Sequence, residues 1–297
     1  MLTSTEVEAY LSRLGFEGAE APTKDFLFAL HRAHVARISW QTVDIYAGRP
    51  VSMALRDSVG LMTAGRSGYC FHLNGAFSAL LRTLGYDVAW HRAGVQPIGR
   101  EAGVNNFHLG LTVDLKGSDS GEQRYVIDVG LGDMPFEPIP LAFGRYRQGP
   151  FAYELKPSAV AEGGWRMEHD PLHGYIGVDF APELVPDLAL FHPNHAHYSQ
   201  SPDSPWMNQF LVRQRDEKSM NELRGCVWKA WDADGCATTE VARKNDWLAL
   251  LADVFGERLA AYSQDERDSI WICVLKQHEE WKREREENKG SNAEKPA

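Results

Sequence analysis

The sequence predicts an α+β fold in which a helical N-terminal region is followed by an antiparallel β region and then by a mixed C-terminal region. Two observations lead to this prediction. Up to Gly85 the apolar residues recur at the spacing of α-helices, and after Gly85 the apolar period changes to two, in short runs separated by Gly, Pro, Asp and Ser. We expect a helical region over residues 1–86, a β region over 87–185, a mixed α/β region over 186–287 and a disordered polar tail over 288–297.

The composition is that of a globular protein with a substantial core. Of the 297 residues, 43% are hydrophobic and 11% are aromatic, which is enough to fill the interior of two or three modest domains. The formal net charge of −10 disfavours a nucleic-acid or anionic membrane surface, since both need clustered Lys and Arg. No segment approaches the roughly 20 apolar residues of a membrane span, and the N-terminus lacks a basic patch followed by an apolar stretch, so we expect a cytoplasmic protein without a membrane partner.

Three helices are expected in the first region. The segment "STEVEAYLSRLGF" is the first, and "TKDFLFALHRAHVARI" is the second, with Thr23 as its cap. The third carries apolar residues at positions i, i+4, i+7, i+8 and i+11, and Gly85 is placed to end it. These apolar residues are Leu73, Phe77, Leu80, Leu81 and Leu84.

The β region contains short runs of alternating or β-branched residues, which predict an antiparallel sheet or a small barrel. They are "DVAWHR", "FHLGLTVDL", "RYVIDVG", "FAYELKP", "GWRMEHD" and "YIGVDFA". A proline-rich connection follows over residues 182–205, and we interpret its histidines, His192, His195 and His197, as part of a polar loop rather than a metal site, because their spacing fits no ligand geometry that we can assign. The strand-like runs "NQFLVRQR" and "GCVWKAW" then precede two helices, near residues 245–259 and 265–286.

The four cysteines, Cys70, Cys226, Cys236 and Cys273, form no C-x-x-C pair and indicate neither a zinc site nor a redox couple. Only Cys70 has a setting that favours reactivity, because it follows a Gly- and Ser-containing turn at the start of the third helix. If Ser67 caps that helix, Cys70 lies in the first turn, where free backbone N–H groups and the helix dipole lower the pKa of a thiol. The alternative is a small buried apolar residue, which is the commoner role of a cysteine.

Two polar residues stand out on successive predicted strands. His108 lies opposite the apolar stripe of "FHLGLTVDL", where the alternative is an ordinary surface histidine. Asp128 lies among apolar residues in "RYVIDVG", which costs free energy unless the carboxylate has a partner; the alternative is that it only caps the turn at "VGLGD". With Cys70 they predict a Cys-His-Asp assembly in which the histidine takes the thiol proton and the aspartate orients the histidine. Such an assembly transfers acyl groups through a thioester.

At these residues the sequence resembles the arylamine N-acetyltransferases. The family pattern R-G-G-Y-C-F-E-x-N around the nucleophile is similar to "RSGYCFHLN" here, "NNFHLGLTV" resembles the family's histidine strand, and "IDVGLGDMPFEPIPL" resembles its aspartate strand. The likeness continues through "SPDSPWMNQFLVRQR" and "LADVFGERL" and covers nearly the whole chain. It implies an N-terminal helical bundle, a central antiparallel β-barrel and a C-terminal α/β lid, around a core like that of cysteine peptidases and transglutaminases.

The resemblance also implies an activity. Cys70, His108 and Asp128 carry over as the catalytic triad; acetyl-CoA acylates the cysteine, CoA leaves, and an arylamine or arylhydrazine takes the acyl group, with no bound cofactor and no metal. One alternative is an amide synthase that joins an acyl chain from an acyl carrier protein to an amine, and another is an N-acyltransferase that uses malonyl-CoA or propionyl-CoA. A thiol hydrolase and a catalytically silent binding module are the remaining hypotheses, and the intact triad counts against the latter.

Two carboxylates of the family pattern are replaced near the nucleophile. In "SWQT", Gln41 stands where the family has an acid, and His72 stands where the family has glutamate. We therefore expect Arg66 to lack its usual anion, and to be paired differently or free for a substrate. Aromatic residues near Cys70 would form a flat pocket for an aryl acceptor. The residues expected to contact substrate are Trp40, Arg66, Tyr69, Phe71, His72, Phe107 and Trp206.

Overall fold

The N-terminal helices pack around α5, the helix that begins at the candidate nucleophile. The structure, a computed structural model, describes residues 1–116, 122–169 and 175–293. Its N-terminal helices are α1 (Ser4–Leu14), α2 (Lys24–Arg37), α3 (Val43–Tyr46), α4 (Leu55–Thr63) and α5 (Cys70–Thr83). The three predicted helices are confirmed: the Thr23 side chain accepts a hydrogen bond from Phe26 N at 3.2 Å, and Gly85 adopts φ +97° just beyond α5. The short helices α3 and α4 are additional.

Antiparallel strands form a nearly closed barrel, which confirms the predicted fold class. They are β2 (Asp87–Pro97), β3 (His108–Lys116), β4 (Glu122–Ile127), β5 (Ile139–Pro140), β6 (Gly144–Gln148), β7 (Phe151–Pro157), β8 (Trp165–His169) and β9 (Tyr175–Leu184). Their order is β5-β4-β3-β2-β9-β8-β7-β6, so the two edge strands are neighbours in the chain. The central strand β3 is covered on both faces: Leu111 and Thr112, which point in opposite directions, are both buried.

A second sheet joins the N-terminal region to the C-terminal region. Its strands are β1 (Trp40–Gln41), β10 (Leu211–Arg215), β11 (Met220–Arg224), β12 (Val227–Asp232) and β13 (Gly235–Glu240), in that order, and all pairs are antiparallel. The helices α7 (Lys244–Asp253) and α8 (Gln264–Ala293) follow. Trp247 and Leu251 of α7 pack with Phe210 in a hydrophobic core of their own, separate from the one beneath the barrel.

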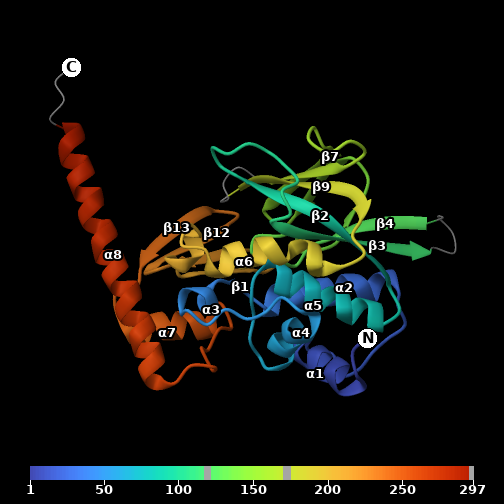
Figure 1. Ribbon diagram of the computed structural model, residues 1–297, viewed down its shortest axis with the longest axis horizontal. Coiled ribbons are helices and arrows are strands. Elements are labelled where there is room, and N and C mark those ends of the chain that lie inside the picture. Colours follow the sequence, from blue (N-terminus) through green and yellow to red (C-terminus); the bar gives the residue numbers. More distant parts are fainter. Residues whose placement is uncertain (117–121, 170–174, 294–297) are drawn as a thin grey trace.

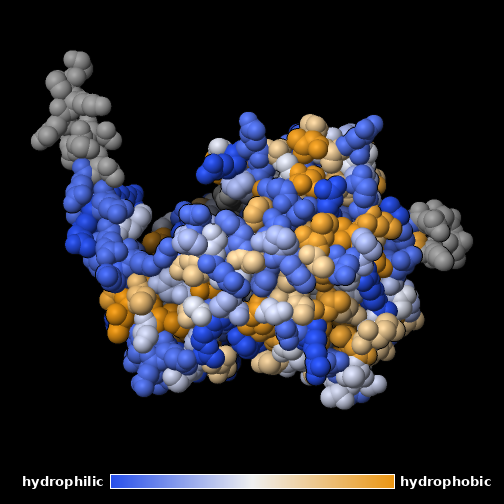
Figure 2. All heavy atoms as spheres, in the orientation of Figure 1, coloured by the Kyte–Doolittle hydropathy of each residue, from blue (hydrophilic) through white to orange (hydrophobic). Residues whose placement is uncertain are grey.

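Helix α8 runs along one side of the molecule and projects beyond it (Figure 1). Its backbone is helical to Ala293, which differs from the disorder expected from residue 288; residues 294–297 lie outside the described part of the chain. Hydrophilic residues cover the described part of α8 that projects, whereas apolar residues gather where it meets the body (Figure 2). None of the described helices combines the length and the apolar character that crossing a bilayer requires.

The connection between the barrel and the second sheet is helical, so the prediction of a polar loop around His192, His195 and His197 is wrong. It contains the 3-10 helix η1 (Leu188–Phe191), helix α6 (His192–Gln200) and the 3-10 helix η2 (Pro205–Met207). Pro193 lies in the first turn of α6, where the missing N–H group of proline is tolerated. Helix α6 crosses in front of α5, beside the barrel (Figure 1).

Candidate active site

Cys70 lies in the first turn of α5, as the sequence predicts, but it is the first residue of the helix, and the cap differs from the expected one. The N-cap residue is Tyr69, which is extended and provides no side-chain hydrogen bond to the helix. Ser67 is not the cap, because its hydroxyl faces that of Ser39 at 3.3 Å. The first backbone N–H groups of α5 therefore have no side-chain cap beside the thiol, at the end of the helix where negative charge is stabilised.

The Cys70 thiol is buried and protonated. Only 4% of the residue is exposed, and Sγ donates a long hydrogen bond to Phe107 O at 3.7 Å. Burial raises the pKa of Cys70 and the charge of Asp128 raises it further, whereas backbone hydrogen bonds from Phe71, Cys70 itself and Leu109 lower it by less. The prediction of a lowered thiol pKa is therefore wrong for this closed arrangement, and the thiol needs a base to lose its proton.

His108 and Asp128 form a buried pair. His108 begins β3, and Asp128 directly follows β4. His108 Nε2 lies 2.6 Å from Asp128 Oδ2, and the two side chains are 1% and 0% exposed, so the alternative of a surface histidine is wrong. Asp128 also caps the turn that follows it, as the alternative interpretation expected, because its other oxygen, Oδ1, accepts a hydrogen bond from Gly130 N at 2.9 Å. The carboxylate thus orients the histidine and caps the turn at the same time.

Asn74 joins the three elements of this site, and the sequence analysis does not single it out. Its side chain is fully buried. Nδ2 donates to Asp128 Oδ1 at 3.0 Å and to Leu109 O at 2.8 Å, while Oδ1 accepts from Val129 N at 2.9 Å. The signal that could have found it is its spacing, because a residue four positions after Cys70 lies on the same face of the helix.

The start of α5 packs directly against the segments that carry the histidine and the aspartate. A Cβ atom at Gly130 would lie 2.9 Å from Cys70 Cα and 2.9 Å from Asn74 Nδ2, which is closer than a side chain tolerates. The thiol's hydrogen bond goes to the carbonyl of Phe107, the residue before His108. Within the described residues, no hydrogen bond joins Sγ to the His108 ring, although the backbone on either side of that histidine touches the cysteine.

Aromatic rings near Cys70 pack against one another, and the aromatic residues expected to contact substrate lie among them. We call this set the ring cluster; it comprises Trp40, Tyr69, Phe71, Phe107, Tyr198 and Trp206. Trp206 lies edge-on to Tyr69, with ring centroids 5.0 Å apart, and stacks on Tyr198 at 3.7 Å. Tyr198 was not among the predicted residues because it lies on α6, in the segment interpreted as a loop.

Two histidines flank Tyr69. The Tyr69 hydroxyl is hydrogen-bonded to His195 Nδ1 of α6. Burial lowers the pKa of His195 to about 4, so its ring is neutral near pH 7. On the other side, His72 Nε2 lies 3.1 Å from Val51 O, and burial lowers the pKa of His72 as well. A neutral ring therefore occupies the position at which the family pattern has a carboxylate.

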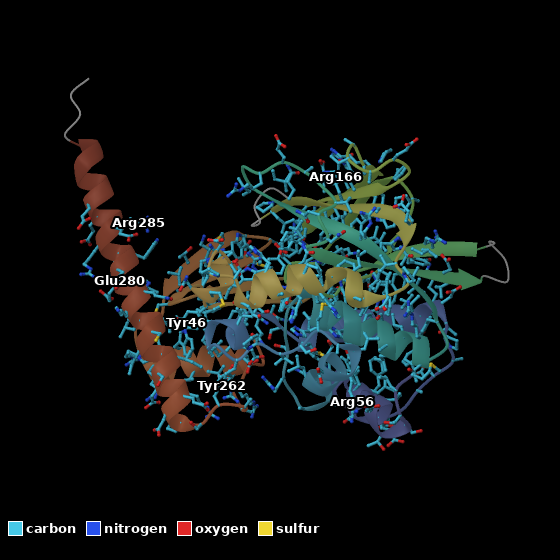
Figure 3. All side chains as sticks on the ribbon, viewed as in Figure 1. Tyr46, Arg56, Arg166, Tyr262, Glu280 and Arg285 are labelled. Atoms are coloured by element: carbon cyan, nitrogen blue, oxygen red, sulfur yellow. The ribbon has the colours of Figure 1, made fainter. Side chains whose placement is uncertain are left out.

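Arg66 has an anion, so the expectation that the change at Gln41 leaves it without one is wrong, and the alternative that it is paired differently holds. Arg66 Nη2 lies 2.8 Å from Asp44 Oδ1, and the same oxygen accepts a hydrogen bond from the Tyr262 hydroxyl at 2.5 Å. Gln41 donates instead to a backbone carbonyl at 3.0 Å. Tyr262, like Tyr46, lies on the side of the molecule that carries α7 and α8 (Figure 3), so this ion pair links that side to the nucleophile's turn.

The histidines of α6 do not form a metal-ligand group in the part of the chain that the structure describes. A group with suitable spacing occurs elsewhere, at Glu240, His278 and Glu279, where β13 meets α8. The Lys282 ammonium lies 3.0 Å from Glu240 Oε1 and 3.4 Å from Glu279 Oε1, so these carboxylates already have a cation.

Comparison with known proteins identifies relatives. The sequence model of a family described as N-acetyltransferase matches residues 24–263. An arylamine N-acetyltransferase of Escherichia coli is 32% identical over 199 residues, which cover 65% of this chain and 68% of the relative. The arylamine N-acetyltransferase of Mycolicibacterium smegmatis is 30% identical over 153 residues, which cover 48% of this chain and 53% of the relative. The chain thus spans about half the length of some curated relatives and about two thirds of others.

Solved structures agree in fold. The arylamine N-acetyltransferase of Mycobacterium marinum superimposes with a TM-score of 0.79 at 23% identity, over 91% of this chain and 98% of that one. The Salmonella typhimurium enzyme gives a TM-score of 0.76 at 20% identity, over 92% of this chain and 99% of that one. At this level of identity the likeness concerns the arrangement of helices and strands.

Proposed function

The chain belongs to the arylamine N-acetyltransferase family, and on this premise we propose that it transfers an acetyl group from acetyl-CoA, through a thioester on Cys70, to an aromatic amine or hydrazine. The observation that carries the proposal is the buried His108–Asp128 pair at 2.6 Å, directly beyond the carbonyl that holds the Cys70 thiol. A buried thiol beside a buried histidine and carboxylate is suited to nucleophilic acyl transfer. Use of an acyl-CoA donor would be in keeping with a cytoplasmic location.

The histidine supplies the base that the protonated thiol requires. A carboxylate only accepts hydrogen bonds, so the His108 nitrogen that faces Asp128, Nε2, carries a proton and the other nitrogen, Nδ1, is free to accept one. When Cys70 Sγ attacks the donor carbonyl, His108 takes the thiol proton and then gives it to the departing CoA sulfur. The acceptor amine next attacks the thioester, His108 takes the amine proton, and Cys70 leaves as the restored thiol.

The helix start supports the charge that develops in both steps. The first N–H groups of α5 lie next to Cys70 without a side-chain cap, and their partial positive charge favours a thiolate or an oxyanion there. In the resting state burial outweighs this effect, so the pKa of the thiol is raised. The sulfur thus becomes a strong nucleophile only once His108 has taken its proton.

A flat aryl acceptor suits the ring cluster. Tyr69 and Phe71 flank Cys70 in the sequence, and Phe107 precedes His108, so aromatic faces adjoin both reacting groups. Trp40 and Trp206 extend the cluster, with ring centroids 5.4 Å apart. Aromatic rings pack against a planar acceptor through offset and edge contacts, which would hold its amine toward the thioester.

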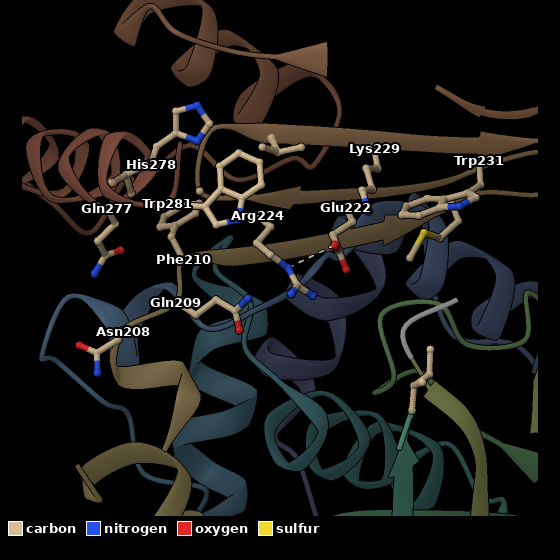
Figure 4. Close-up of a pocket in the computed structure, with 15 residues that line it drawn as sticks. Asn208, Gln209, Phe210, Glu222, Arg224, Lys229, Trp231, Gln277, His278 and Trp281 are labelled. Carbon is tan, nitrogen blue, oxygen red and sulfur yellow. Dashed lines mark ion pairs between the residues drawn. The ribbon is translucent and has the colours of Figure 1, made fainter. Parts of the chain in front are cut away.

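The donor's nucleotide suits a cavity of about 640 Å³ between the second sheet and α8 (Figure 4). Lys229 and Arg224 line it and offer positive charge to phosphate groups, with Arg224 also paired to Glu222 of the same wall at 3.4 Å, and Trp281 offers a face for an adenine ring. Asn208, also in its wall, is two residues after Trp206 of the ring cluster. The chain between them connects the cavity to the thiol site. In the same family, the Mycobacterium marinum enzyme has been solved in complex with CoA.

A second candidate is an amide synthase that takes its acyl chain from a carrier protein. The observation that favours it is similarity to the Proansamycin X synthase of Amycolatopsis mediterranei, which is 32% identical over 143 residues, 46% of this chain and 53% of that protein. The neutral His72 in place of the family glutamate also changes the charge next to Tyr69. Both candidates share the Cys70 thioester and differ in the donor.

Intact-mass spectrometry after incubation with acetyl-CoA, propionyl-CoA, malonyl-CoA and an acylated carrier protein tests the proposal. We expect one acetyl mass from acetyl-CoA, located on Cys70, and its release when an arylamine is added. Cys70→Ala should abolish this acylation, whereas Cys236→Ala, at an exposed thiol, is the matched control and should leave it intact. Acylation of the Cys70→Ala protein would contradict the mechanism, and acylation only by the carrier protein would favour the amide synthase.

A further inference from the structure

We propose that Tyr198 is a specificity-determining residue, whose ring closes the space beside the Cys70 sulfur and restricts the acyl group on the thioester to short chains. The inference rests on the proposed function, because it concerns the thioester on Cys70. It goes further by assigning donor selection to one side chain of α6, a helix that contributes neither the nucleophile nor the pair behind it.

The position of the Tyr198 ring follows from its neighbours. Its centroid lies 5.9 Å from that of Tyr69 and 6.4 Å from that of Phe71, the residues on either side of Cys70. It also lies 4.8 Å from the ring of Phe107, the residue before His108. The Tyr198 ring thus packs against the residues on both sides of Cys70 and against the residue before His108, which places it beside both reacting residues.

The hydroxyl of Tyr198 approaches the same atom as the thiol. Tyr198 Oη lies 3.5 Å from Phe107 O, to which Cys70 Sγ donates at 3.7 Å. One carbonyl oxygen therefore has the phenol and the thiol as simultaneous neighbours. When the thiol loses its proton and becomes acylated, this oxygen keeps the phenol as its donor. The ring can thus stay in place while the acyl group is attached.

The ring is also held from outside. It stacks on Trp206 with centroids 3.7 Å apart and an interplanar angle of 19°, which is the closest ring pair in the cluster. Helix α6 is itself tied to the site by His195, which bonds to the Tyr69 hydroxyl, and by Asn194, whose Nδ2 donates to Asn105 O at 3.1 Å. Tyr198 is therefore a fixed wall rather than a mobile side chain.

The Tyr198 ring, held in place beside the buried Cys70 sulfur, should select acyl groups by their size. Acylation forms an Sγ–C bond at Cys70 and breaks the C–S bond of the donor, and the thiol proton passes through His108 to the departing sulfur, so the acyl chain must extend from Sγ into the enclosed space. Cys70 is 4% exposed, so an acyl group on Sγ lies among buried side chains rather than in water, and the Tyr198 ring is one of the neighbours that bound it. A hydrophobic pocket that excludes a few methylene groups separates short from long substrates by about tenfold or more.

The test compares acylation by acetyl-CoA and hexanoyl-CoA in Tyr198→Ala, Tyr198→Phe and the unaltered protein, followed by intact mass. We expect the hexanoyl-to-acetyl rate ratio to rise by about tenfold or more in Tyr198→Ala, because the ring is lost, and to stay within about threefold in Tyr198→Phe, because the ring remains. Gln200→Ala, at an exposed position of the same helix, is the matched control and should leave the ratio unchanged.

The outcomes separate this inference from the proposed function. An unchanged ratio in Tyr198→Ala, with a melting temperature near that of the unaltered protein, overturns the inference while acetylation of Cys70 still supports the function. If Tyr198→Ala does not fold, Tyr198→Leu takes its place, since it removes the planar ring but keeps an apolar side chain. An unaltered protein that accepts hexanoyl-CoA as fast as acetyl-CoA also overturns the inference, and one that no donor acylates contradicts the function itself.

Discussion

Two substitutions of Asn74 are expected to affect different quantities. Asn74→Ala should mainly lower the free energy of unfolding, and Asn74→Asp should mainly lower the rate of Cys70 acylation. In Asn74→Ala, three hydrogen bonds disappear, to Leu109 O, Asp128 Oδ1 and Val129 N. Asp128 Oδ1 keeps the N–H of Gly130, but the Val129 N–H loses its side-chain partner in the interior. An orphaned buried donor and the other lost bonds together predict a loss of about 3 kcal/mol in the free energy of unfolding.

Asn74→Asp is the sharper variant because it keeps the shape of the side chain. The carboxylate can still accept from Val129 N, but it can no longer donate to Asp128, and it places a second negative charge against the first. The two carboxylates repel each other at hydrogen-bond distance, and sharing a single proton between them relieves this repulsion. The His108 ring then loses its charged partner, and we expect the rate of Cys70 acylation to fall by about a hundredfold or more.

Urea unfolding and single-turnover acylation measure the two effects. Ser78→Ala is the matched control on the same helix: it removes a buried acceptor of the Trp90 indole N–H, away from the His108–Asp128 pair. We expect Ser78→Ala to lose stability but to keep its acylation rate below its melting temperature. If Asn74→Asp acylates as fast as the unaltered protein, or if Ser78→Ala slows as much as Asn74→Asp, Asn74 has only a structural role.

Two further predictions concern the packing around the site. Burial lowers the pKa of His31 to about 4, from 6.5 in the unfolded chain, so between these values only the unfolded chain binds the proton. His31 alone should therefore contribute about 2 kcal/mol to the loss of stability from pH 7 to pH 5, and the loss should be smaller by about that amount in His31→Gln, as measured by urea unfolding at both pH values. A His31→Gln protein with the same loss would contradict this. Gly130→Ala should cost about 1–3 kcal/mol and slow acylation, because the new methyl group meets Cys70 Cα at 2.9 Å; an unchanged melting temperature and rate would refute the close approach.

Local pattern predicted the elements whose apolar residues recur at a regular spacing. Helix α5 has an unbroken apolar stripe, and the helical period ends at Gly85, so both its presence and its end could be predicted. Helix α6 has no such stripe, because its core contacts come from histidine and tyrosine rings, and its proline suggests a turn when read alone. β13 is exposed along its whole length and therefore lacks the alternation that marks a half-buried strand.

The sequence predicted which residues form the candidate site, but not how deeply they are buried or what they contact. Cys70, His108 and Asp128 stand out by chemistry and by their place in the expected elements. The direction in which the pKa of Cys70 shifts could not be predicted in this way. It depends on burial of the thiol against the start of β3, which lies more than 35 residues further along the chain. The roles of Asn74 and Tyr198 depend on contacts of the same long range. The helix N-terminus favours the thiolate here too, but burial of the thiol raises its pKa by more.

Gln41 replaces an acid of the family pattern, yet the positive charge of Arg66 remains balanced by a carboxylate. Arg66 keeps a carboxylate within 2.8 Å because Asp44, three residues further along, points to the same place, and the Tyr262 hydroxyl adds a hydrogen bond to that oxygen. A guanidinium held in this way has little freedom to turn toward a substrate. Differences in substrate choice from other members of the family should therefore arise from the rings of α6 that cover the thiol, and not from a released arginine beneath it.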